Sequence, residues 1–123
     1  MSWVELGGIA LGGAGGALVR ALAGRLLQTD FPLATLLVNI AGSFLLACLH
    51  GMVEPDAAAL HALLGAGFCG ALTTFSTFIL ETAILLRIGQ RRRAAVYVAA
   101  TLVLCSLASA GGFSFAALHA RPA

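Results

Sequence analysis

Four long stretches of apolar residues, separated by short polar connections, constrain this chain more than any other feature. A helix needs about 20 predominantly apolar residues to cross a hydrocarbon core of about 30 Å. Residues 3–24, 33–53, 57–86 and 94–118 each reach that length. Because backbone polar groups inside a bilayer must be satisfied within the protein, such spans are expected to be helices. The sequence therefore predicts an all-α, multi-pass integral membrane protein with four transmembrane helices in one domain.

The composition excludes a soluble domain. Of the 123 residues, 60% are hydrophobic and 10% are charged, against about 25% charged residues in soluble domains. The formal net charge is +2, and four of the seven arginines lie between residues 87 and 93. A nucleic-acid-binding domain would instead spread basic residues along a groove or face. We therefore expect membrane lipid, and no nucleic acid, among the partners.

The connections at residues 28–32, 54–56 and 89–93 are short. Connections of this length place consecutive helices side by side and antiparallel. In the first span Gly8, Gly12 and Gly16 recur at every fourth position, which gives one helix face without side chains. Such a face lets a second helix approach closely, so we expect a packing surface there.

The third stretch is predicted to be a broken helix. At about 30 residues it is longer than a single straight crossing requires, and residues 65–78 are dense in glycine and hydroxyl side chains. Hydroxyl side chains compete with the helical hydrogen bonds of the backbone. Breaks at membrane depth expose carbonyl groups that can coordinate a cation, so we expect a functional site near the middle of this span.

Other kinds of site find little support in the sequence. Residues 65–70 match G-x-G-x-x-G, but the strand and the βαβ unit that a dinucleotide site requires are missing. His50, His61 and His119 lie near span ends and not beside a nucleophile, and the three cysteines are far apart in apolar surroundings. We expect no enzyme activity, disulfide framework or zinc site from these patterns.

The polar side chains within the spans favour an anion pathway. On a helix Thr74, Thr77 and Glu81 share one face, and Phe75 and Phe78 form a neighbouring stripe. Hydroxyl groups, the Asn39 amide and the positive edges of phenylalanine rings can all face a small anion that accepts hydrogen bonds strongly. Arg20 either extends to the membrane surface or draws anions into a vestibule, and the sequence leaves both roles open.

These residues resemble a known family. Residues 70–78, Gly-Ala-Leu-Thr-Thr-Phe-Ser-Thr-Phe, followed by Glu81, are similar to the signature G-G-L-T-T-F-S-T-F-x-x-E of the Fluc (CrcB) fluoride channels. Residues 12–20 resemble that family's first-helix motif G-G-x-x-G-A-x-x-R, and residues 35–39 resemble its T-L-x-V-N motif. Tyr97 and Thr101 match its Tyr-x-x-x-Ser pattern with threonine in place of serine.

The resemblance implies a fluoride-specific channel in the plasma (inner) membrane that passively exports fluoride from the cytoplasm. It also implies a dimer of two subunits in opposite orientations, with two fluoride pathways and a central sodium ion that is structural and not transported. The backbone carbonyls of Gly70 and Thr73 would hold the sodium. The fluoride pathway would be formed by Phe75, Phe78, Ser76, Thr77, Asn39, Arg20, Tyr97, Thr101 and Glu81, with Arg20 and Asn39 shaping its aqueous mouth.

Two alternative functions remain open. A small multidrug-type exporter is also built from four helices, but its mechanism needs a membrane-embedded carboxylate in the first span, where Glu5 lies close to the start of the chain. A membrane assembly subunit without transport activity of its own is the third possibility. Measured flux would separate the three.

The distribution of arginine bears on orientation. With four spans, Arg25, Arg87 and Arg91–Arg93 share one side of the membrane, while the other side has only Arg121 and the amino terminus. The positive-inside rule then favours one orientation with both termini outside, whereas an antiparallel dimer needs both orientations. We expect a dual-topology homodimer, and pairing with a homologous chain of opposite orientation is the alternative.

Overall fold

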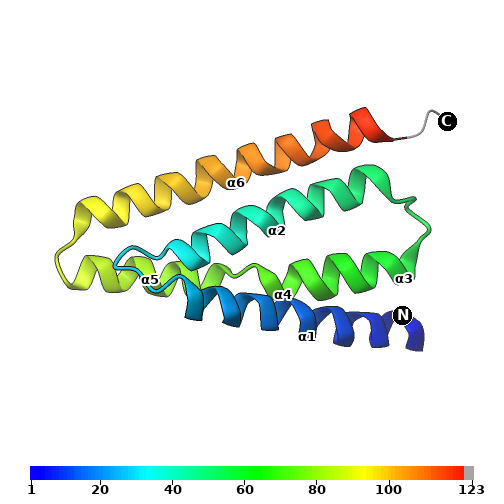
Figure 1. The fold of residues 1–123 in the computed structure, drawn as a ribbon, viewed down its shortest axis with the longest axis horizontal. Coiled ribbons are helices and arrows are strands. Elements are labelled where there is room, and N and C mark those ends of the chain that lie inside the picture. The colour runs from blue at the N-terminus through cyan, green and yellow to red at the C-terminus, as the bar shows by residue number, and fades with distance from the viewer. Residues whose placement is uncertain (121–123) are drawn as a thin grey trace.

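The computed structural model describes residues 1–120 as helices joined by short connections (Figure 1). The elements are α1 (Trp3–Leu26), α2 (Leu33–Met52), α3 (Ala58–Leu60), the π-helix η1 (His61–Cys69), α4 (Gly70–Leu72), α5 (Phe75–Arg87) and α6 (Arg91–His119). Elements α3 to α5 follow one another along a single span of 30 residues. This span and the helices α1, α2 and α6 are each long and apolar enough to cross a membrane. The prediction of an all-α membrane protein with four spans is confirmed.

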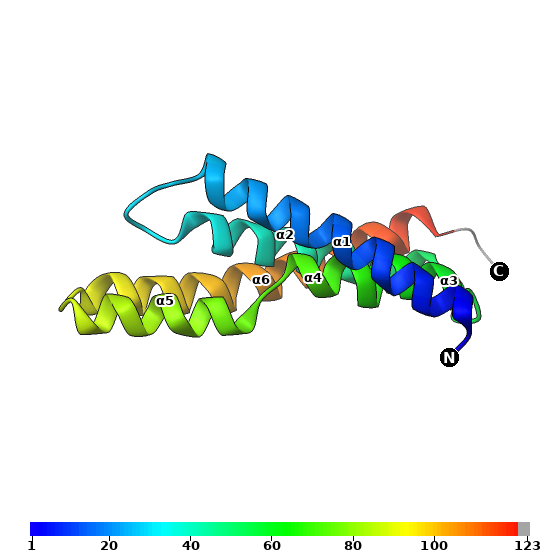
Figure 2. The ribbon, with the colours of Figure 1, turned by 90° about the horizontal axis from the view of Figure 1, so that it is seen from below.

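The spans run up and down and lie in the order α6, α2, third span, α1 (Figure 1). Helix α6 packs along α2, and α1 packs on α3, η1 and α4. In the second half of the third span, α5 packs on α6 and diverges from α1 (Figure 2). The divergence separates the ends of α1 and α5, and it opens a cavity that is described below.

Close packing of α1 depends on glycine, as the sequence predicts. A Cβ atom added at Gly12 would collide with the backbone carbonyl of Leu63, and one added at Gly16 would collide with that of Phe68. Gly67 approaches from the other side, where an added Cβ would lie 2.9 Å from the carbonyl oxygen of Ile9. The two backbones are therefore in direct contact, which is the usual basis of helix association in lipid.

Helices α2 and α6 meet in a similar way. A Cβ atom at Gly112 would lie 2.8 Å from the Cβ of Ala47 and 3.3 Å from the backbone nitrogen of Cys48. The Cys48 thiol also lies 3.6 Å from the Gly112 carbonyl oxygen, to which it donates. Small residues on both helices thus set the distance between them.

The two ends of the bundle differ in charge. The connections at residues 27–32 and 88–90 lie at one end, and the start of α1 and the end of α6 lie at the other (Figure 1). The exposed side chains of Arg25, Arg87 and Arg91–Arg93 gather at the first end, as the sequence predicts. Arg121, which was assigned to the opposite end, lies outside the described residues.

Candidate functional site

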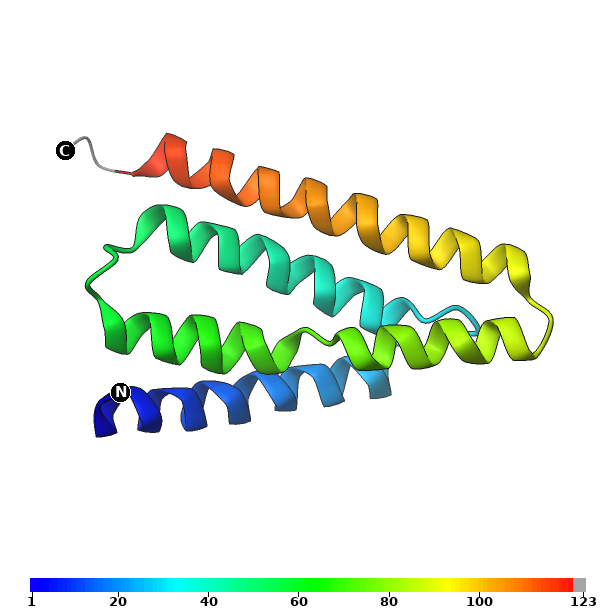
Figure 3. The ribbon, with the colours of Figure 1, turned by 180° about the vertical axis from the view of Figure 1, so that it is seen from behind.

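The third span breaks at Thr73 and Thr74. Their backbone is extended, with φ −82° and ψ 154° at Thr73 and φ −152° and ψ 124° at Thr74. The ribbon loses its coil there, between α4 and α5 (Figure 3). The predicted broken helix is therefore confirmed, and the break is made by two threonines, whereas Gly65, Gly67 and Gly70 remain in helical segments.

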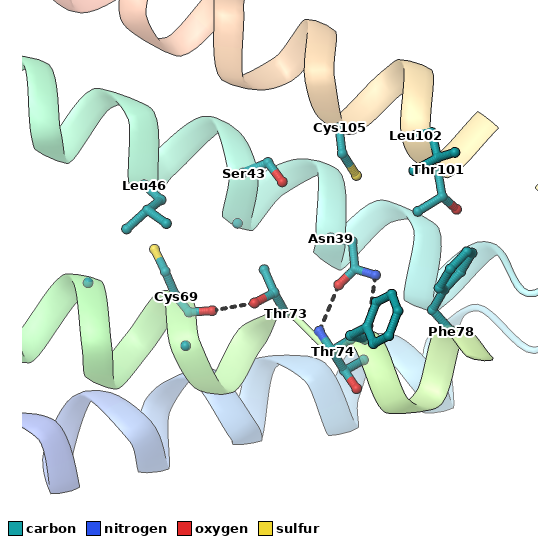
Figure 4. Close-up of a pocket in the computed structure, with 14 residues that line it drawn as sticks. Asn39, Ser43, Leu46, Cys69, Thr73, Thr74, Phe78, Thr101, Leu102 and Cys105 are labelled. Atoms are coloured by element: carbon teal, nitrogen blue, oxygen red, sulfur yellow. Dashed lines mark hydrogen bonds between the residues drawn. The ribbon is translucent and has the colours of Figure 1, made fainter. Parts of the chain in front are cut away.

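Asn39 of α2 closes this break. Its side-chain amide donates from Nδ2 to the Thr74 carbonyl oxygen at 3.1 Å and accepts at Oδ1 from the Thr74 amide nitrogen at 2.8 Å (Figure 4). In a continuous helix the Thr74 amide would donate to the carbonyl of Gly70. The Asn39 amide therefore replaces the helical partners of Thr74 and leaves the Gly70 carbonyl without its usual donor.

Threonine side chains bind two further backbone groups next to the break. Thr73 Oγ1 donates to the Cys69 carbonyl at 2.9 Å, so it terminates the first half of the span. Thr74 is the N-cap of α5, and its Oγ1 accepts from the Thr77 amide at 3.2 Å. Hydroxyl side chains at N-caps stabilise a helix start in this way, which explains why α5 begins directly after the second threonine.

Thr74 lies between two cavities. The first has a volume of about 350 Å³, and the second has a volume of about 680 Å³. Among residues 1–120, Thr74 alone lines both of them. The hydroxyl of Thr74 lies 3.3 Å from that of Ser76 and donates to that of Thr77 at 3.1 Å. A short series of hydroxyl groups therefore lies at Thr74, the residue that both cavities share.

Aromatic side chains border the first cavity. Phe75 and Phe78 both line it, and their ring centroids lie 5.8 Å apart. Phe78 is buried and packs on Tyr97 at 5.2 Å, whereas Phe75 is 75% exposed. Thr101 also lines this cavity, and within residues 1–120 its buried hydroxyl oxygen has no hydrogen-bond partner. Of the two phenylalanine rings at the first cavity, Phe78 is therefore buried within the chain and Phe75 is exposed at its surface.

The second cavity is the more polar one. It lies where α1 diverges from α5, and it is lined by Arg20 of α1, by Thr77 and Glu81 of α5 and by residues of the 27–32 connection. Arg20 therefore lines the same cavity as Thr74 at the break. Of the two roles that the sequence leaves open for Arg20, this position favours the vestibule.

Glu81 is held from two sides. Thr35 of α2 donates to Oε1 at 2.8 Å, and the hydroxyl of Tyr97 on α6 donates to Oε2 at 2.6 Å. Tyr97 is fully buried. These two hydrogen bonds tie three helices together and hold the carboxyl group beside the second cavity.

The structure brings most of the predicted residues around the break. Asn39, Phe75, Phe78 and Thr101 line the first cavity, and Arg20, Thr77 and Glu81 line the second. Ser76 and Tyr97 reach the site through their bonds to Thr74 and Glu81. Gly70 and Thr73, whose backbone carbonyls are predicted to bind sodium, also line the first cavity.

The sequence placed Thr74 on one helix face with Thr77 and Glu81 but did not predict its role as the N-cap of α5, and it did not predict the contact of Thr35 with Glu81. Thr35, Asn39 and Gly42 form one stripe of α2 that faces the third span, where they meet Glu81, Thr74 and Thr73. A signal for Thr74 was present in the sequence, because threonine is a preferred N-cap residue and Thr74 directly precedes the apolar residues of α5. Thr35 begins the T-L-x-V-N motif at residues 35–39, but its bond to Glu81 depends on the alignment of two helices and could not be predicted from the motif.

Comparison with known proteins decides the family. The family described as CrcB-like protein, Camphor Resistance (CrcB), matches residues 8–113. The chain belongs to the CrcB family. It is 47% identical to a fluoride-specific ion channel FluC of Shewanella amazonensis, over 79% of this chain and 83% of the relative. It is 48% identical to a fluoride-specific ion channel FluC 2 of Rhodococcus jostii, over 83% of this chain and 89% of the relative.

A third relative shows a similar degree of identity. The fluoride-specific ion channel FluC of Ignicoccus hospitalis is 46% identical, over 78% of this chain and 81% of that protein. All three relatives are named as ion channels and not as enzymes, which confirms the expectation that the chain has no enzymatic role. The resemblance to the CrcB family seen in the sequence motifs is likewise confirmed.

Proposed function

We propose that this CrcB protein is a passive, fluoride-specific channel whose pathway joins the two cavities at Thr74. The observation that carries the proposal is the position of Thr74, which lines both cavities at the break of the third span. Hydroxyl donors and phenylalanine rings flank this point. The names of the relatives support fluoride as the transported ion.

The chemistry of the lining favours fluoride over larger anions. Arg20 attracts anions to the second cavity, and the hydroxyls of Thr77, Thr74 and Ser76 then offer hydrogen-bond donors one after another. Fluoride is small and accepts hydrogen bonds strongly, so donors at close range replace its water of hydration. Phe75 and Phe78 present ring edges that carry partial positive charge. No fixed positive charge among the described residues lines the first cavity, where it would attract any anion alike.

The exposed side of the first cavity supports a dimer. Phe75 is 75% exposed beside a cavity that lies at a break in a membrane helix. A second copy of the chain covers this side and completes the pathway, in the antiparallel arrangement that the sequence resemblance implies. Pairing with an oppositely oriented homologous chain would cover the same surface.

A structural sodium ion belongs to the same proposal. The Gly70 carbonyl has lost its helical donor, and Gly70 and Thr73 both line the open first cavity. Within residues 1–120 no group of three His, Cys, Asp or Glu side chains could hold a metal. Carbonyl oxygens without such side chains are typical ligands of a hard cation. Two carbonyls from each of two copies would bind the ion, which would offset the burial of these groups.

The direction of transport follows from the charge of the ion. A passive channel lets fluoride move down its electrochemical gradient, and a potential of about 100 mV contributes about 2.3 kcal/mol per elementary charge. A plasma (inner) membrane that is negative inside therefore drives a monovalent anion out of the cytoplasm. We place the protein in that membrane and assign it the lowering of cytoplasmic fluoride.

Ion release from proteoliposomes tests the proposal. Purified protein is reconstituted in vesicles loaded with both fluoride and chloride, and valinomycin with a potassium gradient provides the driving force. The channel should release fluoride and retain most of the chloride. An exporter of organic cations or an assembly subunit without transport activity would release neither anion, and equal release of both would exclude selectivity for fluoride.

A further inference from the structure

At the end of the molecule that is opposite the arginine cluster, two imidazole rings face each other across neighbouring spans. His50 lies in the last turn of α2 and His61 begins η1, and their ring centroids are 5.5 Å apart. Both spans end here in the connection at residues 53–57. Neither histidine lines the two cavities at the break, so neither takes part in the pathway described above.

In each ring, one nitrogen is hydrogen-bonded to a backbone carbonyl, and the other nitrogen is available to a ligand. His50 Nδ1 lies 2.9 Å from the Leu46 carbonyl oxygen, and His61 Nε2 lies 3.1 Å from the Glu54 carbonyl oxygen. A carbonyl accepts only from a protonated nitrogen, which leaves His50 Nε2 and His61 Nδ1 with a free lone pair in the neutral rings. Metal-binding histidines are usually fixed in this manner by a backbone carbonyl.

The spacing of the rings also suits a shared ion. Zinc binds imidazole nitrogen at about 2.0–2.1 Å in tetrahedral geometry, which places the centroids of two rings on one ion about 5 Å apart. The observed 5.5 Å is within a small side-chain adjustment of this value. We propose that His50 and His61 bind a divalent transition-metal ion of the zinc class, a ligand unrelated to fluoride transport.

Water completes the coordination. Within residues 1–120 no third His, Cys, Asp or Glu side chain joins the pair to form a group of three. His119 is the nearest alternative, because it lines a cavity of about 460 Å³ together with His50. Its ring stacks on Phe115 at 4.2 Å, and its Nδ1 is held by the Phe115 carbonyl. The carbonyl bond does not distinguish His119 from His50, but the stacking on Phe115 holds the His119 ring against its own helix α6, so His119 serves as a matched control.

The binding is measured by titrating zinc chloride into protein that carries no histidine tag, in a fluoride-free detergent buffer. We expect one ion per chain, and we expect His50→Ala and His61→Ala each to weaken binding at least tenfold. His119→Ala, which removes a similar exposed imidazole, should leave the affinity unchanged. Cobalt(II) in place of zinc should give visible absorption bands that both pair variants lose.

A second readout is the melting temperature. An ion that binds only the folded protein stabilises it more as the ion concentration rises. An ion bound by both His50 and His61 would also link α2 to η1 across the connection at residues 53–57. The melting temperature of wild type and His119→Ala should therefore rise with zinc, and that of His50→Ala should not. The proposal would be overturned by an absence of zinc binding in the wild type, or by equal affinity in the wild type and both pair variants.

Discussion

Asn39 binds both backbone polar groups of Thr74, at 2.8 Å and 3.1 Å, and so holds the third span open at mid-membrane. The two residues are 35 positions apart and lie on neighbouring spans. Without this side chain, the amide and the carbonyl of Thr74 would face an apolar interior. The structure of the pathway therefore depends on one amide side chain.

Asn39→Ala is expected to destabilise the protein. It leaves two buried backbone groups without partners, and each such group costs about 1–3 kcal/mol. Thermal unfolding in detergent should show the loss, and fluoride flux should fall with it. Ser106→Ala on the exposed face of α6 removes a polar side chain of the same span depth and should change neither quantity. Equal stability of Asn39→Ala and wild type would refute the role of Asn39.

Gly12→Ala is expected to separate α1 from the third span. The new Cβ would collide with the Leu63 carbonyl, and neither backbone can move without disturbing its helix. Overpacking of this kind costs about 1–3 kcal/mol. Gly7→Ala on the same helix has no atom within 4 Å of the new Cβ and should leave the unfolding temperature equal or higher. If both variants unfold alike, the direct backbone contact is not what holds α1.

Removal of sodium is expected to abolish activity and dimer assembly. The carbonyls next to the break, at Gly70 and Thr73, need a cation or hydrogen-bond donors to offset their burial. Flux and the dimer fraction are compared after complete exchange of sodium for N-methyl-D-glucamine, with sodium added back as the control. Full flux and a stable dimer without sodium would contradict the assignment of these carbonyls.

Labelling of a terminal cysteine tag in intact cells is expected to occur from both sides of the membrane. The arginines gather at one end of the bundle, so the positive-inside rule acts against dual topology, but it sets orientation only as a tendency. The native Cys48, Cys69 and Cys105 are first replaced by alanine to remove background labelling. Labelling from one side only, with activity restored by a second chain, would replace the homodimer with a heterodimer.

The spans and the broken helix could be predicted because they depend on local properties of the sequence. The length and polarity of each apolar stretch determine how many helices can cross a bilayer, and paired threonines compete with the helix wherever they occur. The glycine face of α1 was predictable for the same reason, since residues four apart share one face of a helix.

Contacts between distant spans could not be predicted from these local properties. The bond from Thr35 to Glu81 joins residues 46 positions apart, and it exists only because α2 and α5 are aligned so that the two side chains meet. The same holds for Asn39, which the family resemblance assigned to an aqueous mouth and which lies buried with Thr74 as its partner. Helical periodicity predicts which face of a helix a residue lies on. It does not predict the axial register between two packed helices, which decides which residues meet.

The most direct test of the pathway compares fluoride flux in three phenylalanine variants. Phe75→Ile and Phe78→Ile remove the aromatic edges beside the break, while Phe115→Ile changes a ring on α6 that lines neither of the two cavities that meet at Thr74. Initial rates of fluoride release from proteoliposomes are measured for dimers that elute as wild type does. The account predicts that Phe75→Ile and Phe78→Ile each lose most of the flux and that Phe115→Ile retains it. Undiminished flux in both Phe75→Ile and Phe78→Ile would contradict it.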